Sequence, residues 1–442
     1  MRLEDLVLVS VDDHVVEPPG MFDRHVPAAY RDKAPRVIRT AKGDDVWEYE
    51  GQLRPNVGLN AVAGRPPEEY GFEPTSFRQM RRGCYDVHER VRDMNANGVL
   101  ASMCFGSFPS FCGLLWMRAK DKSAAHVMQR AYNDWHIDEW CTAHPGRFIP
   151  LAQLPLWDVA LMADEVRRVA RKGCHAVAFV ENPTLIGMPS IHDRCWDPLW
   201  RVCCDEQVVL AIHIGSVWQP APPSGDSAPE TLMAGVPVAS LHTAADFVFS
   251  DVFRRFPALR VALSEGGIGW IPYFLERIDY LNERHHHWTR WQFAGERPSD
   301  VFRRHFLTCF IDDATGIRAR DAIGVEAIAW ECDYPHSDST WPQAPERLMR
   351  SLAGVPDDEI DQITHGNALR WFQLNALEIA GGRAQASVGA LRALARDVDL
   401  SLMRGTGGKP PADDTARPVT ARDVLTQLAT ALDGSALPGN HR

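Results

Sequence analysis

The stretch LVLVSVDDH at residues 6–14 decides the fold class, because it joins an apolar run of strand length to two chemically active side chains. The run itself, LVLVSV (6–11), is rich in β-branched residues and carries no charge. Such a run is typical of a parallel strand that is buried on both faces. The stretch therefore predicts a central strand with Asp12 and His14 at its polar end.

Seven further apolar runs of strand length follow. They are VLASMCFG (99–106), FIPLAQL (148–154), AVAFV (176–180), VVLAIHI (208–214), RVALS (260–264), FLTCFI (306–311) and AIAWEC (327–332). Amphipathic segments of helical spacing alternate with them, at 87–98, 120–144, 158–173, 194–206, 230–256, 267–284, 313–323 and 342–353. Eight such units could form a doubly wound sheet, but a row of eight favours a closed (βα)₈ TIM barrel, an α/β fold.

Two regions do not fit the repeat. Residues 18–86 are rich in proline, glycine and aromatic residues and predict a hairpin around VWEYEGQLRP (46–55), as an insertion over the barrel mouth. Residues 381–442 form an Ala/Gly/Pro-rich linker that ends in an expected capped amphipathic helix at 420–434. We expect one barrel domain at 1–380 and a tail that docks on the barrel or on a neighbouring subunit.

Composition excludes several classes of protein. Of 442 residues, 45% are hydrophobic and 24% charged, as in a folded globular chain. The net charge of −11 disfavours a nucleic-acid binder, which would show a basic face. The ten cysteines form no CxxC pair, which favours a reduced, cytoplasmic protein. No signal peptide and no apolar stretch of about 20 residues is apparent, so we expect no membrane insertion.

The polar ends of the strands predict a metal site. Strand alternation puts Asp12 and His14 on one face, with Ser10, and turns Asp13 to the opposite face with the valines. His213 ends the fifth run, and Glu265 and Asp333 follow the sixth and eighth. The C-terminal ends of barrel strands meet at the face where barrel enzymes carry out chemistry. Imidazole and carboxylate ligands suit zinc, manganese or iron, with one or two ions per chain.

These motifs resemble the amidohydrolase superfamily, in the branch of aminocarboxymuconate-semialdehyde decarboxylase and related amidohydrolase-2 proteins. The resemblance rests on DDH with Asp12 and His14, on the fifth-strand His213, and on DYPH with Asp333, and it covers about residues 6–375. It implies a distorted (βα)₈ barrel, a catalytic divalent metal, and Asp333 as both ligand and proton handler. This combination of motifs is specific for the superfamily but is only a weak indication of any one substrate.

This chain departs from the family pattern in two places. Many relatives carry HxH or ExH where this chain has DxH, and a histidine where it has Glu265. Three carboxylates around one ion would repel each other by roughly 4 kcal/mol per pair at about 4 Å. Either Glu265 is held protonated as an acid, or a second cation is present. Glu181 could bridge two metals or bond loop amides, and Glu331 is a candidate buried acid beside the site.

Other polar groups leave alternatives open. His336 and His365 are extra imidazoles, and we count His336 among the catalytic candidates with Asp333 and Glu265. Asp312 and Asp313 follow the seventh strand, where they bind substrate or cap the next helix. The glycines of SEGGIGW (264–270) would let backbone amides hold an anion. The triplet at 285–287 is expected on a solvated helix face.

Four functions use this residue set. The leading hypothesis is a metal-dependent hydrolase that acts on a small organic substrate, a carboxylate or an aromatic compound, through a metal-activated water. The alternatives are a non-oxidative decarboxylase, a dinuclear iron or manganese oxygenase, and a non-catalytic partner subunit. We expect a homo-oligomer, a dimer or larger, with a hetero-oligomer left open.

Overall fold

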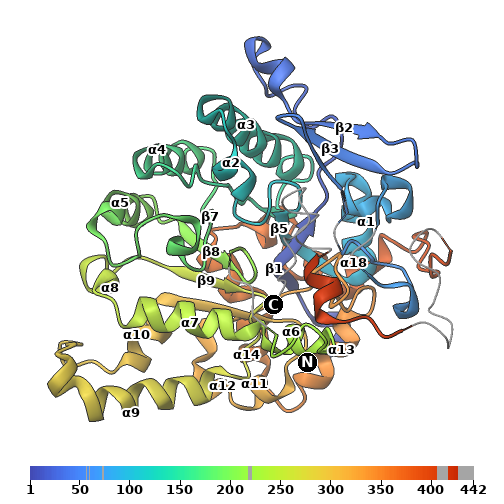
Figure 1. The fold of residues 1–442 in the computed structure, drawn as a ribbon. Helices are drawn as coiled ribbons and strands as arrows, with labels where there is room; N and C mark the ends of the chain where they lie inside the picture. The colour runs from blue at the N-terminus through green and yellow to red at the C-terminus, as the bar shows by residue number, and fades with distance from the viewer. Residues whose placement is uncertain (56, 59, 72–73, 218–221, 406–416, 427–442) are drawn as a thin grey trace.

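The computed structural model describes residues 1–55, 57–58, 60–71, 74–217, 222–405 and 417–426. Eight central strands appear where the apolar runs predict them (Figure 1). They are β1 (Leu8–Val15), β5 (Val99–Gly106), β6 (Phe148–Ile149), β7 (Ala176–Phe179), β8 (Val209–His213), β9 (Val261–Ser264), β10 (Phe306–Phe310) and β11 (Ile328–Trp330).

The eight strands form a closed ring. They pair in parallel as two arcs, β1–β5–β6 and β7–β8–β9–β10–β11. One bridge between Ala152 and Val177 joins the first arc to the second. At the other junction the backbone N–H of Asp333, beyond β11, donates to the carbonyl of Asp12 in β1 at 2.9 Å. The closure confirms the (βα)₈ barrel over the doubly wound sheet.

Helices form a layer around the strands (Figure 1). They are α1 (Val87–Asn97), α2 (Leu114–Arg118), α3 (Lys122–Trp135), α4 (Val159–Ala170), α5 (Asp197–Asp205), α6 (Glu230–Gly235), α7 (Pro237–Val248), α8 (Val252–Arg255), α9 (Ile271–Thr289), α10 (Pro298–His305), α11 (Ala314–Arg318), α12 (Arg320–Ile323), α13 (Ala344–Ser351), α14 (Asp357–Asp361), α15 (Asn367–Trp371), α16 (Ala376–Ile379), α17 (Arg383–Ala386) and α18 (Val388–Ala393). None of the described helices has the length and apolar character that a bilayer crossing requires.

The helix α4 shows how the sequence sets these elements. Asp158 accepts hydrogen bonds from two amides of the first turn, and Gly173 follows the helix with a φ of +79°. Met162, Val166 and Val169 lie on one face and are buried in the single large core, which also contains residues of all eight strands. Segment 230–256, expected as one helix, is divided into α6, α7 and α8.

The insertion contains the expected hairpin. Strands β3 (Asp45–Tyr49) and β4 (Gln52–Arg54) pair antiparallel, and β2 (Arg36–Arg39) adds a third strand. Further along the insertion, the N–H groups of Val62 and Ala63 donate to the carbonyl of Pro335 at 2.9 and 3.0 Å. This part of the insertion therefore lies against the loop that follows β11.

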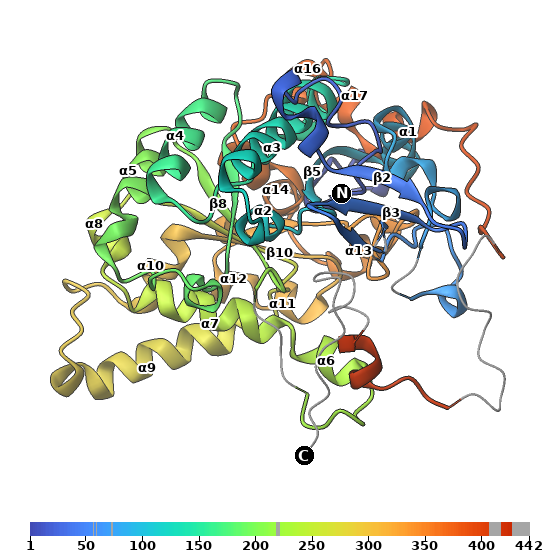
Figure 2. The same ribbon diagram turned by 45° about the horizontal axis from the view of Figure 1, so that its top comes forward.

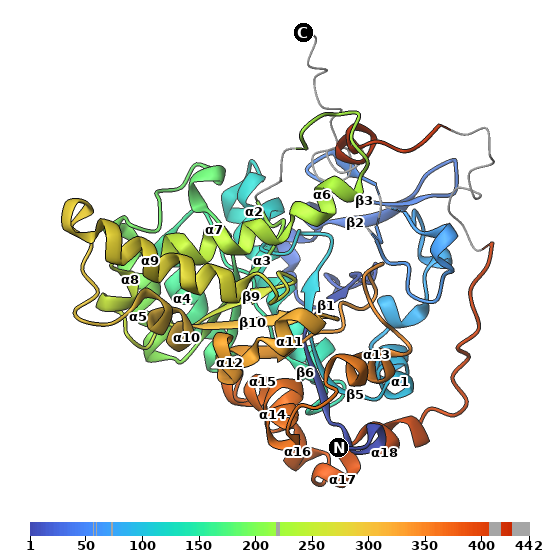
Figure 3. The ribbon, with the colours of Figure 1, turned by 90° about the horizontal axis from the view of Figure 1, so that it is seen from below.

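The C-terminal region differs from the expected linker at its start. Helices α17 and α18, beyond the expected boundary at 380, pack on the barrel, and the N–H of Val388 donates to the carbonyl of Leu6 at 2.8 Å. Figure 3 shows α17 and α18 beside the N-terminus. The apolar side chains of Val388 and Leu391 explain the difference, because both are buried in the core.

Residues 417–426 of the tail lie near α6 (Figure 2). Residues 421–426 are helical, where the capped helix was expected, and Ala421 and Val424 pack on Leu232. The amide of Ala421 donates to the carbonyl of Ser227 at 2.8 Å. Residues 427–434 of the expected helix, and most of the linker, lie outside the described residues.

Candidate metal centre

The barrel brings the five predicted metal-binding residues together. Asp12 and His14 lie in β1, His213 ends β8, and Asp333 follows β11. These four side chains are fully buried. Glu265 comes directly after β9, and its side chain remains 22% exposed. The four strand ends converge because all barrel strands point the same way.

The donor atoms have the spacing of ligands to one ion. His14 Nε2 lies 3.2 Å from Asp333 Oδ1, 3.6 Å from Asp12 Oδ1 and 3.3 Å from His213 Nε2. His213 Nε2 lies 3.5 Å from Asp12 Oδ2 and 3.1 Å from Glu265 Oε2. Two ligand atoms that each bind an ion at about 2.0–2.2 Å are themselves roughly 3–3.6 Å apart. A divalent ion therefore fits among these atoms.

The hydrogen bonding around the cluster supports the same fit. Both carboxylate oxygens of Asp12 are buried without a hydrogen-bond donor among the described residues. A buried, unpaired carboxylate is costly, and a cation removes that cost. His213 Nδ1 donates to the carbonyl of Ile214 at 2.6 Å, which turns the Nε2 lone pair toward the cluster. Burial lowers the pKa of His213 to about 4, so this imidazole stays neutral and able to bind a metal.

The carboxyl groups differ sharply in their pKa values. Burial, with the nearby charges of Glu331 and Glu265, raises the pKa of Asp12 well above its usual range. Burial and the charge of Asp333 raise the pKa of Glu265 in the same way. Burial would also raise the pKa of Asp333, but His336 and His14 outweigh it and lower that pKa. The protein alone therefore favours one ionised carboxylate here, and the other carboxyls need a cation to ionise.

Two of the site residues have strained backbones. Glu265 and Asp333 have φ angles of +59° and +56°, in the left-handed region that costs a non-glycine residue on the order of 1–3 kcal/mol. The N–H of Glu265 donates to Glu331 Oε2 at 3.1 Å, and Glu331 also accepts a hydrogen bond from the thiol of Cys309 at 2.6 Å. Glu331 is thus the buried acid beside the site, and it orients the backbone of Glu265.

The end of β1 does not follow the expected alternation. The pairing with β5 shifts register between Ser10 and Asp13, and Ser10 Oγ donates to Asp13 Oδ1 at 3.0 Å. The prediction that Ser10 shares the face of Asp12 and His14 was wrong, because this bulge brings Ser10 to the side of Asp13. Asp12 and His14 both reach the cluster, and Asp13 between them points to the other side, as predicted. Asp13 also accepts from the N–H of Tyr334 at 3.0 Å, and the buried Arg90 donates to the carbonyl of His14. These bonds fix the position of His14 relative to the loop that follows β11.

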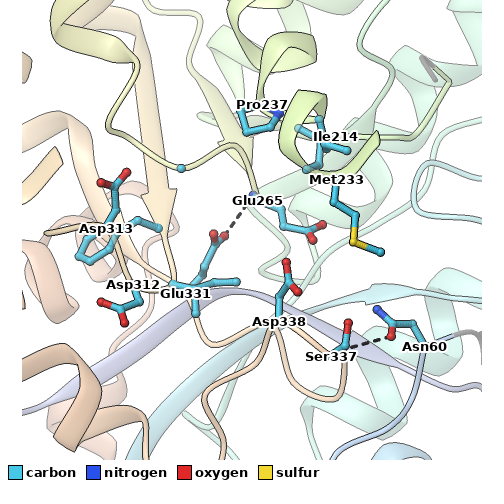
Figure 4. A pocket seen from close by; sticks show the side chains of 14 residues that line it. Asn60, Ile214, Met233, Pro237, Glu265, Asp312, Asp313, Glu331, Ser337 and Asp338 are labelled. Atoms are coloured by element: carbon cyan, nitrogen blue, oxygen red, sulfur yellow. Dashed lines mark hydrogen bonds between the residues drawn. The ribbon is translucent and has the colours of Figure 1, made fainter. Parts of the chain in front are cut away.

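A cavity of about 350 Å³ lies beside the cluster, with Glu265 in its wall (Figure 4). Five of the lining residues are acidic, and the described lining contains no Lys, Arg or His: Glu265, Asp312, Asp313, Glu331 and Asp338. Figure 4 shows the carboxyl groups of Glu265 and Asp338 projecting toward one another, with Met233 nearby. The lining also contains the apolar residues Ile214, Val236, Pro237, Phe310 and Ile311. The cavity is therefore both acidic and partly apolar.

Two aromatic rings contact the cluster. The ring of His336 stacks on that of His14 at 3.6 Å between centroids, and its Nδ1 lies 2.9 Å from Asp333 Oδ1. The ring of Phe111, in the loop after β5, lies 4.1 Å from that of His213. His336 follows DYP and could be found from the sequence. Nothing in the sequence distinguishes Phe111 from the core aromatics around it, so its place beside His213 follows only from the fold.

Two other candidates have structural roles. Glu181 accepts hydrogen bonds from the amides of Gly215 and Val217 at 2.8 and 2.9 Å, which anchors the loop after β8. Glu181 was expected either to bridge two metals or to bond loop amides, and these hydrogen bonds correspond to the second alternative. His365 contacts the backbone of Val7, which precedes β1 and lies at the opposite end of the strand from His14.

The backbone amides of the glycine-rich turn after β9 bind an anionic group, which is the carboxylate of Asp313. Asp313 Oδ2 accepts hydrogen bonds from the amides of Ile268 and Gly269 at 3.0 and 2.6 Å. Its other oxygen accepts from the amide of Gly316 at 2.8 Å and caps α11. Asp312 accepts from the hydroxyl of Ser351 at 2.7 Å. Both aspartates therefore have structural partners, although both also line the cavity.

Comparison with known proteins places this geometry in a family. The chain is 23% identical over 305 residues to a 2-amino-3-carboxymuconate-6-semialdehyde decarboxylase of Dictyostelium discoideum, which covers 68% of this chain and 80% of the relative. An amidohydrolase from Mycobacterium avium subsp. paratuberculosis superposes with a TM-score of 0.64 at 19% identity, over 83% of this chain and 99% of that one. A 5-carboxyvanillate decarboxylase from Novosphingobium aromaticivorans, solved with bound manganese, gives a TM-score of 0.58 at 18% identity, over 85% and 99%.

The sequence model of one family matches residues 46–374. The matched segment begins after β1, so it includes His213, Glu265 and Asp333 but not Asp12 and His14. The last two residues join the set through the barrel, which places β1 beside β11. The eight-stranded ring, the cluster at its C-terminal face and the extent of this match lead to one conclusion: the chain belongs to the amidohydrolase family of enzymes.

Proposed function

We propose that this enzyme is a metal-dependent, non-oxidative decarboxylase of a small carboxylic acid. The observation that carries the proposal is the position of Glu265. Its carboxyl contacts His213 of the ligand cluster at 3.1 Å and also forms part of the cavity wall. A group that can carry a proton thus lies between the cluster of candidate metal ligands and a cavity for substrate. The replacement of a carboxylate by hydrogen requires this arrangement.

The proposed ligands are Asp12, His14, His213 and Asp333. A divalent metal bound there would neutralise the carboxylate of a substrate and polarise a neighbouring oxygen. His336 holds Asp333 in place through its 2.9 Å contact. The rest of the cavity lining offers the substrate no cationic side chain, so its carboxylate would belong at the metal side of the cavity.

The reaction breaks the bond between the carboxylate and the carbon that carries it. Carbon dioxide leaves, the electron pair of the bond remains on that carbon, and a proton takes the vacated position. We assign the delivery of this proton to Glu265. Its partial exposure to the cavity then allows the carboxyl to regain a proton from solvent.

The leading hypothesis from the sequence, hydrolysis, is supported less well than the decarboxylase alternative. Several similar proteins are decarboxylases of carboxylic acids, including enzymes that act on 2-amino-3-carboxymuconate-6-semialdehyde, 5-carboxyvanillate and 2,6-dihydroxybenzoate. The oxygenase alternative needs a second set of ligand residues, which would bind a second metal ion. The two candidate groups among the described residues share His14, so they describe one site, and Glu181 bonds loop amides instead of bridging.

Product analysis tests the decarboxylase. Manganese-loaded enzyme is incubated in D₂O with 5-carboxyvanillate or 2,6-dihydroxybenzoate, each labelled with ¹³C at the carboxyl carbon. We expect labelled carbon dioxide and one deuterium at the vacated carbon. An enzyme that hydrolyses amide or ester analogues of these acids and releases no carbon dioxide would contradict the proposal.

A further inference from the structure

The helix α6 forms part of the cavity wall but is not anchored in the barrel core. Met233 of α6 and Val236, directly after the helix, line the cavity (Figure 4). Leu232 is the single buried residue of α6. It belongs to a small apolar cluster with Ala421 and Val424 of the tail, which is separate from the large core. The burial of α6 therefore depends on the tail.

Backbone hydrogen bonds attach the same part of the tail to the loop that precedes α6. The amide of Ala421 donates to the carbonyl of Ser227 at 2.8 Å. The next amide, of Arg422, donates to the carbonyl of Gly225 at 3.0 Å. The guanidinium of Arg422 also lies against Gly225, where an added Cβ would meet its Nη2 at 2.8 Å. The loop and α6 thus share one contact surface on the tail.

The tail has its own local order where it makes this contact. Asp423 accepts hydrogen bonds from the amide and the hydroxyl of Thr420 at 2.9 and 2.8 Å, which caps the start of the short helix. Arg417 donates to both carboxylate oxygens of Asp423 at 2.8 Å. A segment that is ordered by its own bonds loses less conformational freedom when it docks.

The chain is also attached to a second segment of the cavity wall before it reaches this contact. The amide of Met403 donates to the carbonyl of Gly64 in the insertion at 2.8 Å. The insertion lines the same cavity through Asn60. Two anchors, at Met403 and at residues 420–426, therefore lie on segments that supply the cavity wall.

We propose that residues 420–426 act as a clamp that holds α6 in the cavity wall. When the clamp is docked, Met233 and Val236 cover the substrate with apolar surface and exclude water from it. When the clamp is released, α6 loses the contact that buries Leu232, and the enclosed cavity is populated for a smaller fraction of the time. The apparent affinity for substrate falls by that fraction. This effect on substrate rests on the proposed function, whereas the clamp itself does not.

Val424→Asp tests the clamp in the full-length protein. The substitution places a carboxylate in the small apolar cluster and leaves the large core intact, so the barrel should stay folded and bind its metal. Val419→Asp is the matched control, because it makes the same change in the same tail at a side chain that is 60% exposed. We expect amide hydrogen exchange at residues 230–236 to become at least about tenfold faster in Val424→Asp and to keep the wild-type rate in Val419→Asp.

Leu232→Ala removes the same contact from the side of α6 and should also speed exchange at residues 230–236. If both variants act through one contact, the double variant should exchange no faster than the faster single variant. The KM for the acid that the wild-type enzyme decarboxylates should rise at least about fivefold in Val424→Asp, with kcat within about threefold of wild type.

Unchanged exchange at residues 230–236 in Val424→Asp, with faster exchange confined to the tail, would overturn the clamp. So would effects of Val424→Asp and Leu232→Ala that add in full. A wild-type enzyme that releases no carbon dioxide from 5-carboxyvanillate or 2,6-dihydroxybenzoate would count against the decarboxylase alone, because the exchange measurement needs no substrate and still decides whether the clamp exists.

Discussion

Replacing Asp333 by asparagine is expected to abolish turnover while the protein stays folded. Asp333 Oδ1 lies 3.2 Å from His14 and 2.9 Å from His336, so the substitution removes the negative charge at the centre of the cluster. An amide oxygen is a weaker ligand for a divalent ion, and an amide does not take up a proton. We expect kcat/KM to fall by about 10³-fold or more, with less bound metal.

Asparagine suits this position in other respects. It has nearly the size of aspartate, and it is one of the few residues that tolerate the left-handed backbone found here, with φ of +56°. The melting temperature should therefore change little. Asp312→Asn is the matched control, because Asp312 lines the same cavity but bonds Ser351. If Asp333→Asn keeps more than about a tenth of the wild-type activity, its role as ligand and proton handler is wrong.

Replacing Glu265 by glutamine is expected to separate catalysis from metal binding. Glutamine keeps the length of the side chain but has no acidic proton, so turnover should fall by about 10²–10⁴-fold. The four proposed ligands remain, so the metal content should stay at one ion per chain. Kinetics and elemental analysis of the same preparation measure both quantities.

Asp338→Asn serves as the control for Glu265→Gln. It removes a charge from the same cavity wall and leaves the contact with His213 intact. We expect it to change turnover by less than about tenfold. If Glu265→Gln instead loses half of a two-ion complement, Glu265 is a bridging ligand, and the single-metal decarboxylase is the wrong description of this site.

The sequence predicts the barrel well because its strands are read from local features. Each apolar run is long enough to bury a strand, and Asp12, His213 and Asp333 end such runs, so their convergence follows from the parallel barrel. The division of 230–256 into three helices is harder to predict from the sequence. Pro237 removes a backbone donor there, yet proline is also common in the first turn of a helix, so its effect depends on packing.

Features set by tertiary contacts could not be predicted. The bulge that brings Ser10 to the side of Asp13 depends on the pairing of β1 with β5. The left-handed backbone of Glu265 depends on its bond to Glu331, far along the chain. The amides of the glycine-rich turn were expected to hold an anion, but only the folded chain shows that Asp313 fills that role. Long-range partners determine all three.

The central claim is a divalent metal centre at the C-terminal face of the barrel, and anomalous scattering tests it most directly. Crystals of the manganese-loaded enzyme, measured at the manganese absorption edge, should show one strong peak among Asp12, His14, His213 and Asp333, with elemental analysis giving one ion per chain. The absence of a peak there in protein that elemental analysis shows to be loaded, or a peak bound only by other residues, would contradict the account.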